Sequence, residues 1–253
     1  MKRALLCVSF GTSVDAARES ITAVENALQE EAPGLVFMRA FTSPTIRRIL
    51  AGRGETVMSL TEALMGLEKL GFREVAVQPT HVLYGHEYDK LREEIFLLQP
   101  RFDSLKLGRP LLGDTDDMRQ VAALLSEAYP PVEGENLIVF GHGTDHPGNA
   151  VYPAIQTAFR LAGREDILVG TVEGWPDYET VLAQLKAQQV KKVHLVPMML
   201  VAGEHAVSDM NGDGDSWRTR LEAEGISVRC TVRGLGVMPG VQALYRDHLK
   251  EIL

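Results

Sequence analysis

A repeated apolar pattern, displaced by 118 residues, constrains the fold of this sequence more than any other feature. The first copy runs from Leu64 to Gly85 and the second from Leu182 to Gly203. The matching positions are Leu64, Leu67, Val75, Pro79 and Gly85 in the first copy and Leu182, Leu185, Val193, Pro197 and Gly203 in the second. The pattern passes from helical spacing to a short apolar run and a loop. It therefore predicts a duplicated helix–strand–loop unit and a chain made of two similar halves.

Short apolar runs alternate with amphipathic helical patterns along the whole chain. Strands are expected at Ala4–Phe10, Leu35–Phe41, Glu74–Pro79, Leu105–Leu107, Asn136–Phe140, Ile167–Val172, Lys192–Pro197 and Ser227–Thr231. Their near-continuous apolarity is typical of strands covered on both faces, as in a parallel sheet. The order predicts an α/β protein whose two halves are doubly wound parallel sheets.

The boundary between the halves is expected near residue 115. Leu111-Leu112-Gly113 precedes one helical pattern, and the similar Gly234-Leu235-Gly236 precedes the last one. The expected halves are therefore residues 1–115 and 116–253. In such folds ligands bind beyond the carboxyl ends of the strands.

Composition and charge exclude several classes of protein. The formal net charge of -8 argues against a nucleic-acid binder, which needs a basic face for phosphate contacts. No apolar run approaches the roughly 18 residues of a membrane span. The first apolar run has no small-residue cleavage site after it, which favours a first strand and a cytoplasmic protein. Cys7 and Cys230 lie in predicted strands without a C-x-x-C pair, so both are expected to be reduced thiols.

Polar side chains follow three successive strands of the second half. His142 lies between Gly141 and Gly143, Glu173 follows the strand ending at Val172, and His205 ends a mostly apolar run. Taken alone, His142 could equally cap a helix or bond a loop, Glu173 could be an N-cap or a solvated loop residue, and His205 could be a surface histidine, although its apolar run favours a pocket. Together, two imidazoles and a carboxylate suit a borderline divalent ion that keeps coordination positions open for a substrate. In the first half, Thr12 stands at the position equivalent to His142, and Glu87 at the position equivalent to His205.

Other local motifs do not support a function. Asp209–Gly214 matches the opening of a calcium loop, but its twelfth position is Arg220 where a glutamate is required. We expect instead that Asp215 or Ser216 caps a helix at Trp217–Ala223. There is no phosphate-binding loop, dinucleotide fingerprint or serine-hydrolase elbow, so nucleotide dependence is unsupported.

Several strings in the same order resemble one known family. They are Leu5–Ser13, Arg39–Ser43, Gly85–Tyr88, Gly141–Gly143, Pro197–His205 and Asp213–Trp217. In these segments the chain resembles the anaerobic cobalt chelatases of cobalamin biosynthesis (the CbiK family), which are class II chelatases acting on sirohydrochlorin. The resemblance covers essentially the whole chain. It implies a bilobal chelatase-like fold with two pseudo-symmetric halves and an active-site cleft between them.

The resemblance also implies an activity and a site. The activity is that of a lyase, a sirohydrochlorin cobaltochelatase that inserts Co2+ without ATP and needs no cofactor. The implied residues are His142, Glu173 and His205 as metal ligands, His142, His205 and Glu87 as catalytic groups, and Ser9, Phe10, Thr12 and Ser13 for the tetrapyrrole. His86 departs from the family, which commonly has an acidic residue there.

Substrate binding and the choice of metal leave alternatives. Backbone N–H groups near Ser9, Thr12 and Ser13 at the first helix start, with Arg47 and Arg48, are candidates to bind the substrate carboxylates. Imidazole and carboxylate accept Fe2+ and Ni2+ as well as Co2+. A sirohydrochlorin ferrochelatase for siroheme and a noncatalytic carrier of metal or tetrapyrrole are the alternatives. The expected partners are the tetrapyrrole and a divalent metal, with no nucleic acid or membrane, and a homo-oligomer is compatible.

Overall fold

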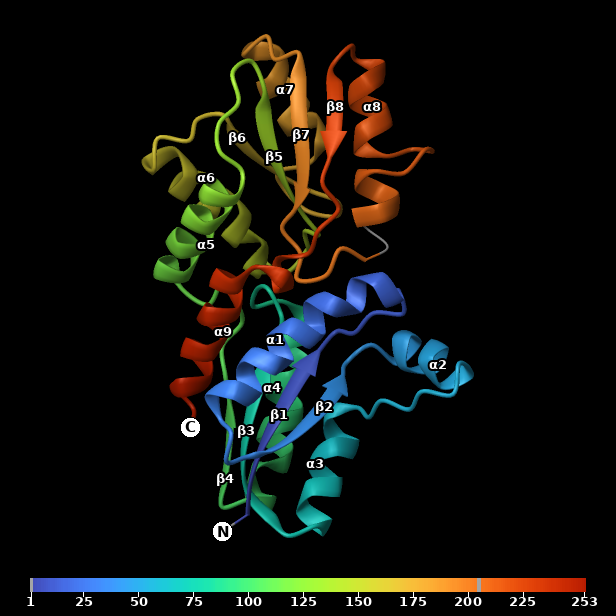
Figure 1. Cartoon of the computed structure of the whole chain (residues 1–253), viewed down its shortest axis with the longest axis vertical. Coiled ribbons are helices and arrows are strands. Elements are labelled where there is room, and N and C mark those ends of the chain that lie inside the picture. Colours follow the sequence, from blue (N-terminus) through green and yellow to red (C-terminus); the bar gives the residue numbers. More distant parts are fainter. Residues whose placement is uncertain (1, 204–205) are drawn as a thin grey trace. The chain divides into compact units, whose positions relative to one another are not determined.

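The computed structural model describes residues 2–203 and 206–253 (Figure 1). The chain divides into two compact units. Unit 1 comprises Met1–Leu111 and Gly236–Leu253, and unit 2 comprises Leu112–Leu235. Each unit contains a four-stranded parallel sheet.

The sheet of unit 1 has the strand order β2-β1-β3-β4. Its strands are β1 (Lys2–Ser9), β2 (Val36–Phe41), β3 (Phe72–Pro79) and β4 (Ser104–Leu107). One face packs against α3 (Leu60–Lys69) and α4 (His86–Leu98) through a core that includes Leu6, Leu64 and Val77. On the other face α1 (Arg18–Glu31) contacts α9 (Pro239–Lys250). The short helix α2 (Pro44–Gly52) follows β2.

The sheet of unit 2 repeats this arrangement in the order β6-β5-β7-β8. Its strands are β5 (Asn136–Gly141), β6 (Ile167–Thr171), β7 (Lys192–Pro197) and β8 (Ser227–Cys230). One face packs against α7 (Tyr178–Ala187) and α8 (Trp217–Ala223). On the other face α5 (Thr115–Ala128) contacts α6 (Val151–Leu161).

The duplicated unit expected from the sequence is confirmed. Helices α3 and α7 begin and end at positions displaced by the same 118 residues, and β3 and β7 end at Pro79 and Pro197. The copies diverge after the shared glycine. In unit 1 α4 begins immediately at His86, whereas unit 2 has a π-helical turn at Ala206–Met210 and starts α8 only at Trp217. The repeat therefore places strands and covering helices, but not the loop that follows them.

The two-half α/β fold is confirmed, and the eight expected strands are present with ends shifted by no more than two residues. Ser216 caps α8 as expected, since its hydroxyl accepts a hydrogen bond from the Thr219 N–H. Both cysteines are free thiols: Cys7 is buried and Cys230 partly so. Within residues 2–203 and 206–253, every helix is too short or too polar to span a bilayer.

The units differ from the expected division into residues 1–115 and 116–253 in the placement of the last helix. Helix α9 follows β8 of unit 2 along the chain but belongs to unit 1, where it packs on α1. Conversely, α5 follows β4 of unit 1 and packs on α6 of unit 2. Amphipathic spacing identifies the apolar face of a helix but not the sheet that it covers. This is why the sequence pattern assigned α9 to the second half.

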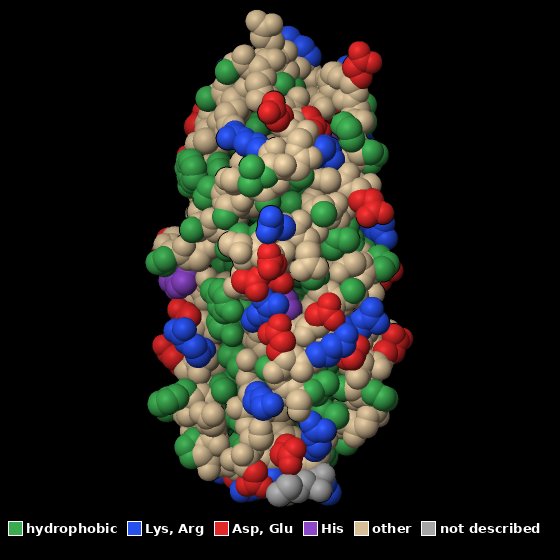
Figure 2. Space-filling model, turned by 90° about the vertical axis from the view of Figure 1, so that its left-hand side faces the viewer, with side chains coloured by type: hydrophobic (Ala, Val, Ile, Leu, Met, Phe, Trp, Pro, Cys, Tyr) green, Lys and Arg blue, Asp and Glu red, His purple; other side chains and the backbone are tan. Residues whose placement is uncertain are grey.

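Charged side chains of both signs are interspersed with hydrophobic ones on the face seen in Figure 2. Most ion pairs join partly exposed side chains, such as Arg3 with Glu74 and Lys186 with Glu224. Such pairs contribute little to stability, because solvent screens them.

One ion pair in unit 1 is different, because its carboxylate is buried. Glu25 on α1 is 1% exposed, and Arg39 on β2 binds it with two nitrogens. The Arg39 Nε to Glu25 Oε1 distance is 2.7 Å. The hydrogen bonds to Glu25 raise the pKa of the Arg39 guanidinium. The pair therefore joins α1 to the edge strand of the sheet.

Replacing Arg39 with alanine is expected to lower the free energy of unfolding by about 3 kcal/mol, because it leaves the Glu25 carboxylate buried without its partner. Denaturant unfolding measures this loss. The control removes both charges, as Glu25→Gln with Arg39→Met, and is expected to cost less. Equal losses in the two variants would show that the unpaired charge is not the cause.

Candidate active site

The backbone around His142 is fixed by a close approach of two glycines. His142 follows β5, and Gly143 has φ +79°. A side-chain carbon at Gly143 would press on the backbone of Gly174 and lie 2.8 Å from Cβ of Thr171. The Gly143 N–H also donates to the buried Tyr152 hydroxyl at 3.1 Å. Only glycine at position 143 allows these two loops to lie this close.

The same close approach brings His142 and Glu173 together. The Glu173 N–H donates to the His142 carbonyl at 2.9 Å, which extends the β5–β6 pairing by one step. The side chains then lie on the same edge of the sheet, with His142 Nδ1 3.9 Å from Glu173 Oε2. They are 44% and 59% exposed, so both are open to a ligand from solvent.

The His142 ring can adopt the tautomer that a metal ligand needs. Its Nδ1 lies 3.0 Å from the Gly143 carbonyl oxygen. When Nδ1 carries the proton and donates to this carbonyl, Nε2 carries the lone pair. Metal-binding histidines commonly use such a hydrogen bond to fix their ring orientation.

Only part of the expected metal set can be placed. Two of the three expected ligands, His142 and Glu173, are close together, whereas His205 lies outside the described residues. Among residues 2–203 and 206–253, no group of three or more His, Cys, Asp or Glu side chains is arranged to hold a metal ion. The three-ligand set therefore stays a prediction.

The residues expected to contact the tetrapyrrole lie in unit 1 after β1. Ser9 and Thr12 are buried: Ser9 Oγ accepts a hydrogen bond from Thr80 at 2.8 Å, and Thr12 Oγ1 accepts one from the Val14 N–H. Phe10 is 51% exposed and Ser13 is half-buried. Their substrate contacts stay predictions.

The prediction that Ser9, Thr12 and Ser13 lie at the start of the first helix is wrong. Helix α1 begins only at Arg18, after a 3-10 turn at Asp15–Ala17. The loop and this turn separate Ser9, Thr12 and Ser13 from its N-terminus. The argument that these residues bind anions at a helix start therefore fails, because the apolar spacing fixed the body of α1 but not its first turn.

Glu87 is the second residue of α4, in its first turn, and follows the N-cap Gly85 and His86. Lys90 Nζ lies 2.6 Å from its carboxylate. Burial raises the pKa of Glu87, but hydrogen bonds from Lys90 and Thr42 outweigh this and hold the pKa below its usual value. Glu87 is therefore an ionised, half-buried carboxylate. The arginines proposed for the substrate carboxylates lie on α2, where Arg47 pairs with Glu62 at 3.4 Å and Arg48 is exposed.

Two residues of these sites carried no sequence signal. Tyr152 is buried, as the spacing of α6 predicts, but the spacing gave no sign that its hydroxyl accepts a hydrogen bond from the Gly143 N–H. His81 follows β3, and both of its ring nitrogens are buried. A single histidine after a strand predicts no particular role. The only sequence signal for His81 is its position just after the strand end at Pro79-Thr80.

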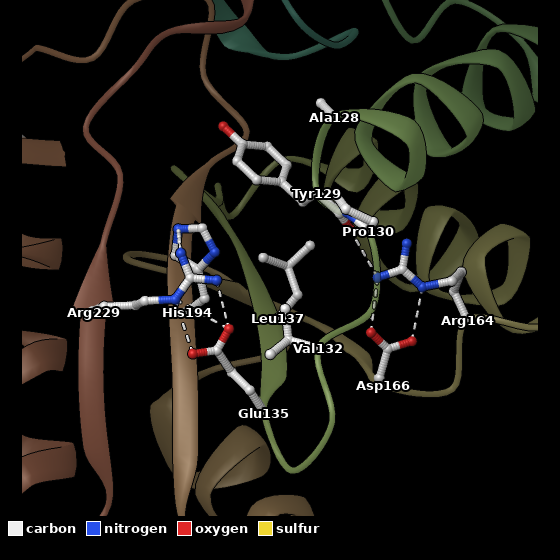
Figure 3. A pocket seen from close by; sticks show the side chains of 10 residues that line it. All are labelled: Ala128, Tyr129, Pro130, Val132, Glu135, Leu137, Arg164, Asp166, His194 and Arg229. Carbon is white, nitrogen blue, oxygen red and sulfur yellow. Dashed lines mark hydrogen bonds and ion pairs between the residues drawn. The ribbon is translucent and has the colours of Figure 1, made fainter.

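A separate pocket of about 200 Å³ lies in unit 2 at the opposite, amino-terminal edge of the sheet (Figure 3). His194 on β7 lies between Tyr129 and the ion pair of Arg229 with Glu135. Its Nε2 is 2.8 Å from Thr231 Oγ1. Burial, together with the charge of Arg229, lowers the pKa of His194 to about 4. The pocket's charged groups pair with one another, which indicates a structural role.

The fold of the chain is that of chelatases. The structure of SirB from Bacillus subtilis with Fe3+ matches all of this chain and 96% of its own, with a TM-score of 0.68 and 17% identity. The structure of CbiX, described as the terminal enzyme for biosynthesis of siroheme in denitrifying bacteria, covers 99% of this chain and 100% of its own with a TM-score of 0.57 and 17% identity.

The sequence comparisons define the family within this fold. The family model for cobalt chelatase (CbiK) matches residues 3–253. The sirohydrochlorin cobaltochelatase of Salmonella typhimurium is 40% identical over all of this chain and 97% of its own length. The sirohydrochlorin cobaltochelatase CbiKC of Nitratidesulfovibrio vulgaris is 32% identical over 98% of this chain and 89% of its own. This chain belongs to the cobalt chelatase (CbiK) family.

Replacing Gly143 with alanine is expected to separate the His142 and Glu173 loops, because the added carbon has no room against Gly174. Overpacking and positive φ together should cost about 2 kcal/mol of stability and weaken metal binding. Co2+ titration and thermal unfolding check the two effects. Gly163→Ala is the control, since Gly163 also has positive φ (+77°) but open space around it. Metal binding that falls equally in both variants would contradict the steric argument.

Stability is expected to fall as the pH falls from about 6.5 to about 4, because the unfolded chain binds a proton at His194 that the folded chain excludes. This one group contributes at most about 1.4 kcal/mol per pH unit. In His194→Gln the free energy of unfolding should depend less steeply on pH in that window. The control replaces the exposed His86 with Gln. Equal slopes for wild type and His194→Gln would refute the assignment.

Proposed function

We propose that this chain is a sirohydrochlorin cobaltochelatase, which inserts Co2+ into sirohydrochlorin without ATP in anaerobic cobalamin biosynthesis. Family membership over residues 3–253 supports the reaction class. The observation that carries the assignment of the site is the pairing of His142 and Glu173, 3.9 Å apart at the carboxyl end of the β5–β6 pair. Lyase chemistry of this kind treats the metal as a substrate rather than a resident cofactor.

His142 and Glu173, together with His205, are proposed to hold the incoming ion. An imidazole nitrogen and a carboxylate oxygen are suitable donors for Co2+, which is of borderline softness. Three protein ligands leave positions for water, and these positions pass to the pyrrole nitrogens during insertion. A small ligand set is favourable, because the metal must leave with the product.

Insertion also requires two protons to leave the pyrrole nitrogens. His142 is the proposed acceptor, since imidazole exchanges protons near neutral pH. Glu87 is proposed to assist in unit 1, where Lys90 keeps its carboxylate ionised. The substrate carries many carboxylates, while the protein has a formal net charge of -8. Local donors on the protein must therefore offset this repulsion, and Arg48 on α2 is an exposed candidate.

Substitution of His142 or His205 with alanine is expected to lower the rate of Co2+ insertion by on the order of 100-fold or more, because each removes a metal ligand. Anaerobic insertion, followed by the absorbance of sirohydrochlorin, measures the rate with Co2+ and with Fe2+. Glu173→Gln keeps the shape and removes the charge, and it should also slow insertion. His194→Gln, at the opposite edge of the same sheet, is the matched control and should keep the wild-type rate.

The same assay separates the alternatives. Faster insertion of Fe2+ than of Co2+ would favour a ferrochelatase for siroheme. Tight binding of metal or tetrapyrrole with a rate no greater than the uncatalysed reaction would favour a noncatalytic carrier. Either outcome would overturn the proposed cobaltochelatase activity.

A further inference from the structure

Trp175 is a large aromatic side chain that lies partly in solvent, two residues after Glu173. It is 53% exposed, in the loop between β6 and α7. The second tryptophan of the chain, Trp217, is 5% exposed and packs edge-on against Phe140 and Tyr178, with ring centroids 5.0 and 5.3 Å away. Leaving a ring of this size half in water forgoes free energy that burial would release. The ring of Trp175 is therefore available to a ligand.

The loop that carries Trp175 is closed at its base. The N–H and the hydroxyl of Thr171 both donate to the Pro176 carbonyl, at 2.8 and 3.1 Å. Between them along the chain, the Glu173 N–H donates to the His142 carbonyl at 2.9 Å. These bonds tie the loop to the end of β6 and to the loop after β5. The main chain of Trp175 is thereby held at the carboxyl edge of the sheet.

Asn149 joins this loop to the loop after β5 with both ends of its amide. Its Nδ2 donates to the Trp175 carbonyl at 2.7 Å, and its Oδ1 accepts a hydrogen bond from the Thr144 N–H at 3.1 Å. A side-chain carbon at Gly174 would collide with this Oδ1, so the amide fits only because position 174 is glycine. Asn149 therefore fixes Trp175 relative to the loop that carries His142.

A flat conjugated ring is the ligand that suits an exposed indole held in this way. Aromatic side chains bind such rings by stacking or by edge contacts, and neither needs a charge. A tetrapyrrole has a broad apolar face, with its carboxylates at the rim. A macrocycle that receives a metal ion from Glu173 covers the residues around that ligand, and Trp175 lies two residues away in the same closed loop. An uncharged contact is also not opposed by the negative charges of the substrate and of Glu173.

We infer that Trp175 is a contact surface for the face of the tetrapyrrole, and that Asn149 is the residue that positions it. The identity of the substrate rests on the proposed function. The inference adds to that function a side chain that sets the affinity for the macrocycle and not the affinity for the metal.

The test measures the two substrates separately on the full chain under anaerobic conditions. Binding of metal-free sirohydrochlorin is followed by its absorbance, and binding of Co2+ by equilibrium dialysis. Trp175→Ala is expected to raise the Kd for sirohydrochlorin by about tenfold, the cost of losing one stacked aromatic ring, and to leave the Kd for Co2+ unchanged. In turnover, the KM for sirohydrochlorin should rise while the KM for Co2+ stays the same. Trp175→Phe keeps a flat aromatic face and should restore most of the affinity.

Leu161→Ala is the matched control, because Leu161 is an exposed apolar residue of the same unit, 83% exposed at the end of α6. It should change neither Kd. An unchanged Kd for sirohydrochlorin in Trp175→Ala would overturn the inference, as would an equal loss of affinity in Leu161→Ala. All variants are compared at the circular dichroism of the wild-type chain.

Ionic strength separates an aromatic contact from an electrostatic effect. Salt screens interactions between exposed charges but not an uncharged contact. The ratio of the Kd values of Trp175→Ala and wild type should therefore be the same at low and at high salt. A ratio that falls to one at high salt would overturn the inference.

Asn149→Ala tests the positioning role. It should raise the Kd for sirohydrochlorin, but it should add little once Trp175 is alanine, because the two residues act as a unit. Fully additive losses would overturn the positioning role. So would a rise in the Kd for Co2+ as large as that for sirohydrochlorin, since Asn149 would then act through the loop of His142.

Turnover of the wild-type chain is measured in parallel, so that the two proposals fail separately. Insertion of Co2+ with a sirohydrochlorin affinity that does not depend on Trp175 would overturn only the aromatic contact. Trp175-dependent binding of sirohydrochlorin by a chain that inserts no metal would overturn only the proposed enzymatic activity.

Discussion

A parallel sheet must be covered by helices on both faces, because its strands carry apolar side chains on both faces. In unit 1 the second cover is completed by α9, a helix that the chain reaches only after passing through the whole of unit 2. Tyr245 on α9 is fully buried and donates to the carbonyls of Thr80 and His81. The covering helix therefore also fixes the segment after β3, which carries His81.

In unit 2, two glycines without side chains fix the positions of the loops after β5 and β6. Gly143 and Gly174 approach so closely that the loops after β5 and β6 share a backbone hydrogen bond. This holds His142 and Glu173 on adjacent strands with their side chains 3.9 Å apart. The pairing of β5 with β6 sets the distance between His142 and Glu173, and the two glycines let their loops touch. The two side chains therefore need few packing contacts of their own.

Sequence patterns predicted the helices and strands whose apolar residues are buried in the same way in both halves. Leu64 and Leu182, or Val75 and Val193, have matching burial because each lies in the same place of a duplicated helix and strand. The loop after Gly85 and Gly203 escaped prediction, because it is not part of the shared core and its two copies fold differently. The unit to which α9 belongs was not predicted either, since the apolar face of a helix does not reveal which sheet it covers. His81 escaped prediction because its distinguishing property, two buried ring nitrogens without a hydrogen-bond partner among the described residues, exists only in three dimensions.

The path of the chain also bears on the order in which the units are completed during synthesis. Unit 2 is one continuous stretch, Leu112–Leu235, and can bury its core as soon as that stretch has left the ribosome. Unit 1 is begun first, yet the face of its sheet that α9 covers stays open until Pro239–Lys250 has been made. On the ribosome, the part that is translated first is therefore the part that is finished last.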